Sequence, residues 1–314
     1  MTSPAPPHRD GPDPEPGTSA WRLRSPWERV TLAVPYAWLA FFFLAPFAIV
    51  FKISVADPIV AQPPFTPLFD VGAEGATSLH LTLDNYAFVL ADRLYLLTYL
   101  GSLKLALLTT FLCLLLGFPM AYGIARSEPT TRRVLLMLVI MPFWISFLLR
   151  VYAWMGILGR HGVLNELLLW TGVISQPLEL LHTDAAVFLG MVYSYLPFMI
   201  LPLYATLERL DESLLEAASD LGGRPAEVFR DVTLPLALPG TIAGCLLVFI
   251  PAMGEFVIPA LLGGADTLMI GRVVYEEFFF NRDWPVAATV AVLLLLLLVG
   301  PIVLLQRYQE EDAT

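Results

Sequence analysis

The stretch LLEAASDLGGRPAEVFRDVTLPLALPG, from Leu214 to Gly240, is a charged segment between two long apolar runs. It contains acidic residues and arginines, although 57% of the chain is hydrophobic and only 15% is charged. Two adjacent glycines divide the segment, and a proline follows them closely. Glycine commonly ends a helix, and proline fits the first helical position. The stretch therefore predicts two short helices joined at a sharp corner.

Long uncharged runs indicate that most of the remaining chain is suited to lipid. The mean hydropathy is +0.70, and runs without a charged residue cover Val30–Phe51, Ala185–Leu207 and Trp284–Leu305. A helix of about 22 residues rises about 33 Å, which is enough to cross a hydrocarbon core of about 30 Å. A segment that crosses lipid must be helical, because its backbone polar groups have to pair with one another.

Three further apolar runs are interrupted by charge only near their ends. We therefore expect an all-α integral membrane protein, with six transmembrane helices at about 30–52, 97–125, 134–158, 184–206, 238–261 and 284–306. The first 27 residues contain seven prolines and little that could be buried, so residues 1–27 are predicted to form a disordered tail. The membrane domain is then 28–307, and 308–314 form a short acidic tail.

Lysine and arginine are unevenly distributed between the two sides of this predicted domain. With the N-terminus inside, eleven of these residues lie in cytoplasmic segments and four in outside loops. Such an excess is typical of cytoplasmic loops. We therefore expect both termini to face the cytoplasm, together with the segment 207–236, which is called the charged loop below.

Local signals predict the limits of the two helices in the charged loop. Ser213 and Glu216 have the spacing of a capping box, which predicts where the first helix begins. Gly222 is expected to end that helix, because glycine readily adopts the left-handed conformation found at helix ends. Pro225 fits the first position of the second helix, and Pro235 is expected to end it.

Small residues on the first helix would let another backbone approach closely. Ala217, Ala218 and Gly222 have little or no side chain, and charged residues surround them. We interpret this surface as a docking site for a cytoplasmic partner. The alternative is an amphipathic loop whose apolar side rests only on the ends of its own transmembrane helices.

One set of residues in the charged loop has a distinctive spacing, namely Glu216-Ala217-Ala218, Gly222, Val232 and Leu234-Pro235. This set resembles the EAA loop in permeases of ATP-binding-cassette (ABC) importers, although Val232 replaces the usual isoleucine and Arg224 the usual small residue before proline. The resemblance implies a type I ABC importer permease fold, in which this loop docks onto an ATPase subunit. It implies ATPase-coupling contacts at Glu216, Ala217, Ala218, Gly222, Phe229, Leu234 and Pro235.

Longer stretches from about Val30 to Arg307 are similar to permeases of polyamine importers. They include MPFWISFLLRVYAWMGIL and YSYLPFMILPLYATLERLD, while LMIGRVVYEEFFFNRDWPVA is most similar to the putrescine-type subunit. Related permeases for iron, thiamine and phosphonates share the general frame and remain alternatives. The resemblance implies three kinds of partner: a dimer of ATPase subunits, a second homologous permease, and a periplasmic or lipid-anchored solute-binding protein.

The implied function is ATP-driven import of a putrescine-like polyamine by alternating access. The chain would lie in the bacterial inner membrane, with membrane lipids as further partners. The sequence has no G-x-x-x-x-G-K-[ST] motif, so ATP and Mg²⁺ are expected on the partner ATPase, with no cofactor, metal or enzymatic activity in this chain. The net charge of −10 does not suggest nucleic-acid binding. Two other classes are disfavoured. A secondary transporter would show internal repeats, and a membrane-bound enzyme would show a catalytic motif, but neither feature is evident in the sequence.

Glu255 is the main candidate for contact with a cationic substrate. It lies in an apolar run between Pro251 and Pro259 and directly follows Gly254, so we expect the fifth transmembrane helix to be broken there. A carboxylate on a water-filled path would attract a protonated amine. The alternative is an internal salt bridge or hydrogen bond that fixes helix packing.

Aromatic residues near the predicted path could contribute cation–π contacts with an amine. The candidates are Trp144, Tyr193 and Tyr195; ordinary packing or an interfacial position is the alternative for each. Arg150 is expected to pair with an acid at the outer end, such as Glu255 or Asp184, or to bind interfacial groups. Ala260 stands where polyamine permeases often have a second acid, which weakens the case for cation selectivity within the membrane.

Overall fold

The computed structural model describes residues 26–67, 69–71, 77–79, 81–264 and 267–311. The predicted disordered tail therefore lies outside the described residues except at its last two positions. The chain divides into two units, Met1–Ile49 and Val50–Thr314. Each unit is described by itself below.

The described part of the first unit is helical. Helix α1 (Pro26–Leu39) continues through a π-helical turn η1 (Ala40–Leu44) into α2 (Ala45–Ser54), which extends into the second unit. The stretch Val30–Ser54 is 25 residues long and apolar enough to cross a membrane. The structure thus confirms a helix of spanning length at the first predicted span.

Two short strands and a short helix follow α2 in the second unit. Strands β1 (Phe69–Val71) and β2 (Thr77–Leu79) pair antiparallel as a short hairpin in this loop, beside a fold that is otherwise helical in the described residues. Helix α3 (Asp84–Ala91) comes next. Its buried Asn85 fixes the chain that leaves α2, because its side-chain amide donates hydrogen bonds to the carbonyl oxygens of Ser54 at 3.1 Å and Ala56 at 2.8 Å.

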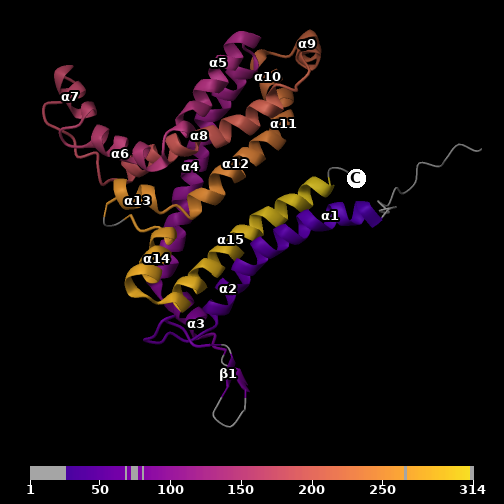
Figure 1. Ribbon diagram of the computed structural model, residues 1–314. Coiled ribbons are helices and arrows are strands. Elements are labelled where there is room, and N and C mark those ends of the chain that lie inside the picture. Colours follow the sequence, from indigo (N-terminus) through magenta and orange to yellow (C-terminus); the bar gives the residue numbers. More distant parts are fainter. Residues whose placement is uncertain (1–25, 68, 72–76, 80, 265–266, 312–314) are drawn as a thin grey trace, which may run out of the picture. The chain divides into compact units, whose positions relative to one another are not determined.

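Three long helices form the centre of the second unit and pack against one another (Figure 1). They are α4 (Arg93–Ala125), α8 (Asp184–Leu207) and α12 (Leu238–Met253). Their shared core contains methionines, small apolar residues and Cys113. Both cysteines are free thiols, as the apolar sequence around them indicates.

The third predicted span, 134–158, is not one continuous helix. Helix α5 (Pro129–Ile140) passes into a 3₁₀ turn, η2 (Met141–Trp144), and the chain then turns by 93° into α6 (Phe147–Leu158) and α7 (Val163–Trp170). Pro142 cannot donate a backbone hydrogen bond, and the backbone is extended beyond the turn at residues 145–146. The loss of a backbone donor within an apolar run allows this break.

The fifth predicted span is interrupted where the sequence indicates. Helix α12 ends at Met253, and α13 (Val257–Leu262) begins after a short non-helical segment that contains Glu255. Helix α14 (Ile270–Glu276), the π turn η4 (Glu277–Asn281) and α15 (Trp284–Glu311) complete the described chain. The Asp283 carboxylate accepts the Val286 N–H at 3.1 Å and caps α15.

By length and composition, three described helices could cross a membrane, or up to five if each bent pair counts as one span. A shorter apolar helix covers Trp284–Gly300. The protein is therefore predominantly helical and suited to a membrane. The total of six transmembrane helices and the direction of each one stay predictions.

Glycine allows α8 and α12 to approach closely. A Cβ atom at position 240 would lie 2.8 Å from the carbonyl oxygen of Pro202 and closer still to the Thr206 hydroxyl. We predict that Gly240→Ala lowers the free energy of unfolding by about 1–3 kcal/mol, because the backbone of α8 has to move. Thermal unfolding of the detergent-purified chain measures this effect. Gly123→Ala is the control, since no described atom lies within 4 Å of a Cβ there; equal stability of the two variants would contradict the prediction.

Candidate functional site

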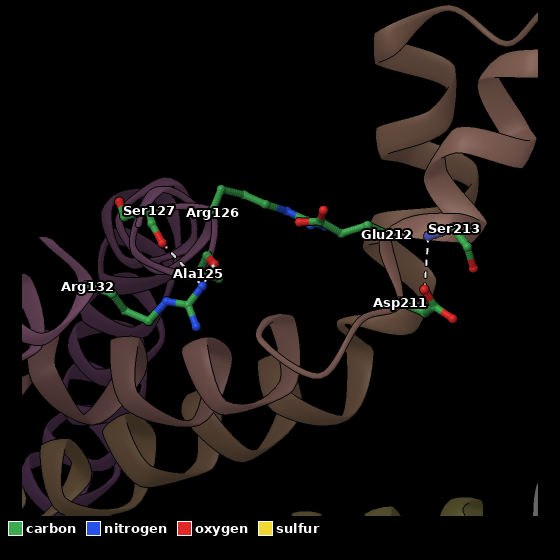
Figure 2. Close-up of polar contacts among 7 residues, drawn as sticks. All are labelled: Ala125, Arg126, Ser127, Arg132, Asp211, Glu212 and Ser213. Carbon is green, nitrogen blue, oxygen red and sulfur yellow. Dashed lines mark hydrogen bonds and ion pairs between the residues drawn. The ribbon is translucent and has the colours of Figure 1, made fainter. Parts of the chain in front are cut away.

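The first helix of the charged loop is α9 (Glu212–Asp220), and its cap differs from the sequence prediction. Asp211 is the N-cap, and its carboxylate accepts the Ser213 N–H at 3.0 Å (Figure 2). Ser213 thus lies within the first turn, and the predicted capping box with Ser213 as the cap was wrong. Aspartate two residues earlier provides an equally good acceptor, and its negative charge is favourable at a helix N-terminus.

The glycine corner forms as the sequence predicts. Gly222 has φ of +90° and follows the end of α9. Its N–H bonds to the carbonyl of Ser219 at 2.9 Å, while Gly223 N–H bonds to that of Ala218 at 3.1 Å. This pair of bonds is a Schellman motif, which satisfies the last carbonyl groups of α9. The positive φ explains why glycine is required at position 222.

The second helix of the charged loop is longer than predicted. Pro225 begins α10 (Pro225–Val228), which continues through the π turn η3 (Phe229–Thr233) into α11 (Leu234–Leu236). Pro235 lies inside the helical stretch rather than ending it, in the first turn of α11, where proline is tolerated. The chain instead turns by 64° between α11 and α12.

The cap of this second helix compensates for the unusual Arg224. The Glu227 carboxylate accepts the backbone N–H of Arg224 at 2.8 Å. Glutamate three residues into a helix satisfies a backbone donor in this way even when the N-cap side chain is not an acceptor. The helix therefore begins in order although the sequence departs from the usual small residue.

The seven predicted coupling residues lie on the charged loop and are exposed, apart from the half-buried Ala218. Phe229 also packs edge-on against Phe118 and Tyr122 of α4, with centroid distances of 5.5 and 6.1 Å. Leu221, at the corner, is 90% exposed. The apolar side of the loop thus rests partly on α4, while its small-residue surface and corner stay open to a partner.

Two ion pairs attach the charged loop to the α4–α5 connection, and sequence analysis did not identify them. Arg126 binds Glu212 of α9 at 2.6 Å, as Figure 2 shows, and Arg132 binds Glu208 at 2.8 Å. Arg132 also donates to the carbonyl of Ala125 at 2.9 Å. The only signal in the sequence is a set of charged residues at the ends of neighbouring spans. These contacts tie α4, α5 and the loop together at one end of the helical bundle (Figure 1).

Glu255 is 8% exposed and holds the break between α12 and α13 together. One carboxylate oxygen accepts the backbone N–H groups of Phe256, Val257 and Ile258 at 3.1, 2.9 and 3.3 Å. The other oxygen accepts the hydroxyl of buried Tyr195. These bonds satisfy donors that the interrupted helix leaves free. The alternative role of Glu255, an internal hydrogen bond that fixes helix packing, is therefore present in the structure. Its contact with substrate stays a prediction.

Of the other predicted path residues, only Tyr195 lies at Glu255, where its hydroxyl donates to the carboxylate. Tyr193 packs edge-on against Trp154 with a centroid distance of 5.4 Å. Trp144 is 74% exposed beside the break that follows η2. The structure thus brings Tyr195 and Glu255 together and leaves Tyr193 and Trp144 elsewhere on the described surface.

Arg150 does not form either of the ion pairs that the sequence predicts. It is 8% exposed, and its guanidinium carbon lies 5.6 Å from the centroids of both Phe143 and Phe147. Its Nε and Nη1 atoms are buried without a hydrogen-bond partner in the described part of the chain. Glu255 and Asp184 bond to hydroxyl groups instead. A buried, partly unsatisfied cation is costly, and aromatic rings compensate only in part.

Residues 113–310 match the family described as the inner membrane component of binding-protein-dependent transport systems. The match covers more than half of the chain and includes α8, the charged loop and α12. The chain therefore belongs to this family. It is an inner-membrane component of a transport system.

Similar proteins point to a narrower group. The spermidine/putrescine transport system permease protein PotB of Haemophilus influenzae is 39% identical over 272 residues, which cover 86% of this chain and 90% of that protein. PotB of Escherichia coli is 47% identical over 213 residues, covering 68% of this chain and 77% of that protein. These relatives confirm the similarity to polyamine permeases that the sequence indicates.

A solved structure shows the same fold. It is a bacterial alginate ABC transporter in complex with an alginate pentasaccharide-bound periplasmic protein. One of its chains matches with a TM-score of 0.63 and 16% identity, and the match covers 88% of this chain and 92% of that one. At this identity the likeness concerns the fold alone.

The ion pair between Arg132 and Glu208 predicts a pH dependence. A hydrogen bond from Tyr204 and the nearby Arg132 lower the pKa of Glu208 from its usual value. A carboxyl with a lowered folded-state pKa contributes stability above its unfolded pKa, about 4.3, and loses it as pH falls through the folded value. We expect the thermal midpoint of the purified chain to fall less below pH about 4.3 in Glu208→Gln than in the wild type. Tyr204→Phe should lie between them; identical pH profiles would contradict the assignment.

Proposed function

We propose that this chain is a permease subunit of an ATP-driven importer for polyamines, with putrescine or spermidine as substrate. The main support is the extensive similarity to two spermidine/putrescine permeases. The chain also belongs to the family of inner membrane components of binding-protein-dependent transport systems. The glycine corner and the small-residue surface of the charged loop support the same class. Permeases for iron, thiamine or phosphonates are the second candidate, and the polyamine relatives favour the first.

The proposed topology has six transmembrane spans with both termini in the cytoplasm. Three helices and two bent pairs would give up to five spans by length and composition, and the shorter apolar helix Trp284–Gly300 would be the sixth. The arginines of the charged loop and of the segment from Arg126 to Arg133 support the cytoplasmic side for both, because lysine and arginine are concentrated in cytoplasmic loops. In this topology the break after η2 lies within the first bent pair, whereas the break at Glu255 directly follows the second pair, which ends at Met253.

An ATPase subunit would dock on the charged loop. Ala217 and Gly222 are exposed, so a partner backbone could approach them closely, and Leu221 could enter a pocket. The ion pairs of Arg126 and Arg132 connect the loop to the α4–α5 connection. Movement of the ATPase would therefore be passed to the helices rather than absorbed by a flexible loop. ATP and Mg²⁺ would be bound by that subunit.

A second permease and a solute-binding protein would complete the importer. The unsatisfied guanidinium of Arg150 supports a second subunit, because a carboxylate from a neighbour would satisfy it. The similar fold of a transporter crystallised with its periplasmic protein supports an external binding protein. Substrate would pass between the two permeases as the ATPase dimer closes and opens, which gives alternating access.

Gly222→Asp tests the coupling role of the charged loop. In vesicles that contain the full importer, we expect at least about tenfold lower uptake of putrescine, because the new side chain would meet the ATPase surface. The matched control is Gly172→Asp: Gly172 also has a positive φ, of +73°, and no described atom lies within 4 Å of a Cβ at either position. Ligand-driven ATP hydrolysis that survives Gly222→Asp, or an equal loss in both variants, would refute coupling through this corner.

Glu255→Gln tests whether the charge of this buried carboxylate serves cation passage. Glutamine keeps an acceptor for the three N–H groups of α13 but removes the charge that would attract an amine. We expect putrescine uptake to fall by about tenfold or more with normal chain levels in the membrane. Glu276→Gln is the control, because it removes an acid that pairs with Arg272 outside this site. Unchanged uptake would leave Glu255 with its capping role alone.

A further inference from the structure

A cavity of about 560 Å³ lies between α4, α5 and α8 in the described part of the chain. Most of its lining is apolar, with Met120 from α4, Leu135 and Val139 from α5, and Leu196 and Ile200 from α8. The hydroxyl groups of Ser127 and Tyr193 are the polar side-chain groups among its lining residues. No carboxylate lines it, so the cavity suits a hydrocarbon chain and not a polyamine cation.

Arginines lie at the Ser127 end of this cavity. Arg132 is on the same face of α5 as Leu135 and Val139, one turn closer to the helix start. Its Nη2 atom donates to the carbonyl of Ser127, a lining residue, at 3.2 Å. Arg126 directly precedes Ser127, and Figure 2 shows its side chain extending from there toward Glu212. The cavity therefore has an apolar body and a basic end.

Each of these arginines keeps an unused donor. Arg132 Nε and Arg126 Nη2 are buried without a hydrogen-bond partner in the part of the chain that the structure describes. The Nη1 atom of Arg126 binds Glu212, and the Nη1 atom of Arg132 binds Glu208. A buried N–H group without an acceptor is unfavourable. Neither arginine lines the cavity itself, so an anionic oxygen at this end would bind these donors after the arginine side chains turn toward it.

We propose that the cavity binds an anionic phospholipid, with one acyl chain between α4, α5 and α8 and the phosphate at Arg132 and Arg126. Basic pockets between transmembrane helices are suited to anionic headgroups. The same two arginines hold the charged loop, so the lipid would strengthen the base on which that loop rests. This site is separate from Glu255 and requires only that the chain lies in the membrane.

The test is retention of lipid by the full chain, purified in detergent and analysed by native mass spectrometry with added phosphatidylglycerol or phosphatidylcholine. The wild type should retain phosphatidylglycerol preferentially. Arg132→Gln should reduce this retention about fivefold, whereas Arg133→Gln should not, because Arg133 is an exposed neighbour whose Nε donates to Pro129. Thermal unfolding of both variants shows whether each remains folded.

A second pair of variants tests the acyl chain independently of charge. Gly123 lines the cavity, and no described atom lies within 4 Å of a Cβ there, so Gly123→Leu should fill space that the lipid needs. Gly156→Leu is the matched control, an exposed helical glycine on α6 with equally open surroundings. Loss of phosphatidylglycerol only in Gly123→Leu supports the site. Equal retention by both glycine variants, equal retention of phosphatidylcholine, or displacement of the lipid by spermidine would overturn the proposal.

Discussion

Backbone groups within hydrocarbon must find partners inside the protein, and the structure depends on how this requirement is met where its helices break. The clearest case is the break between α12 and α13. The Glu255 carboxylate there accepts three consecutive N–H groups and the Tyr195 hydroxyl. Without such an acceptor, the interrupted helix would leave several buried donors unsatisfied. The same carboxylate that could attract a cation is thus also what allows the helix to be interrupted.

The charged loop is largely exposed, and local hydrogen bonds hold the ends of its two short helices. Asp211, the Schellman bonds around Gly222 and the Glu227 carboxylate satisfy the ends of its two short helices. Helices of this length are marginal by themselves. The ion pairs of Arg126 and Arg132 therefore matter as connections, because they attach the loop to the end of α4 and to α5.

Several features could be predicted from the sequence because they depend on nearby residues. Gly222 ends α9 because glycine readily adopts the positive φ of a helix end, and Pro225 begins α10 because the fixed φ of proline suits the first helical position. The break near Glu255 follows from adjacent glycine and proline. The cap of α9 was assigned to Ser213 instead of Asp211 because two suitable acceptors lie two residues apart, and sequence spacing does not decide between them.

The sequence by itself determined that this is a helical membrane protein with a polar, glycine-cornered loop, because hydropathy and backbone preference act over short distances. Only the tertiary structure decided that Arg126 and Arg132 bind that loop, that Arg150 lies over aromatic rings, and that Glu255 binds Tyr195. It also decided the 93° turn after η2 and the cavity beside Ser127. These features join residues far apart in the chain, and their partners are set by how α4, α5, α8 and α12 pack.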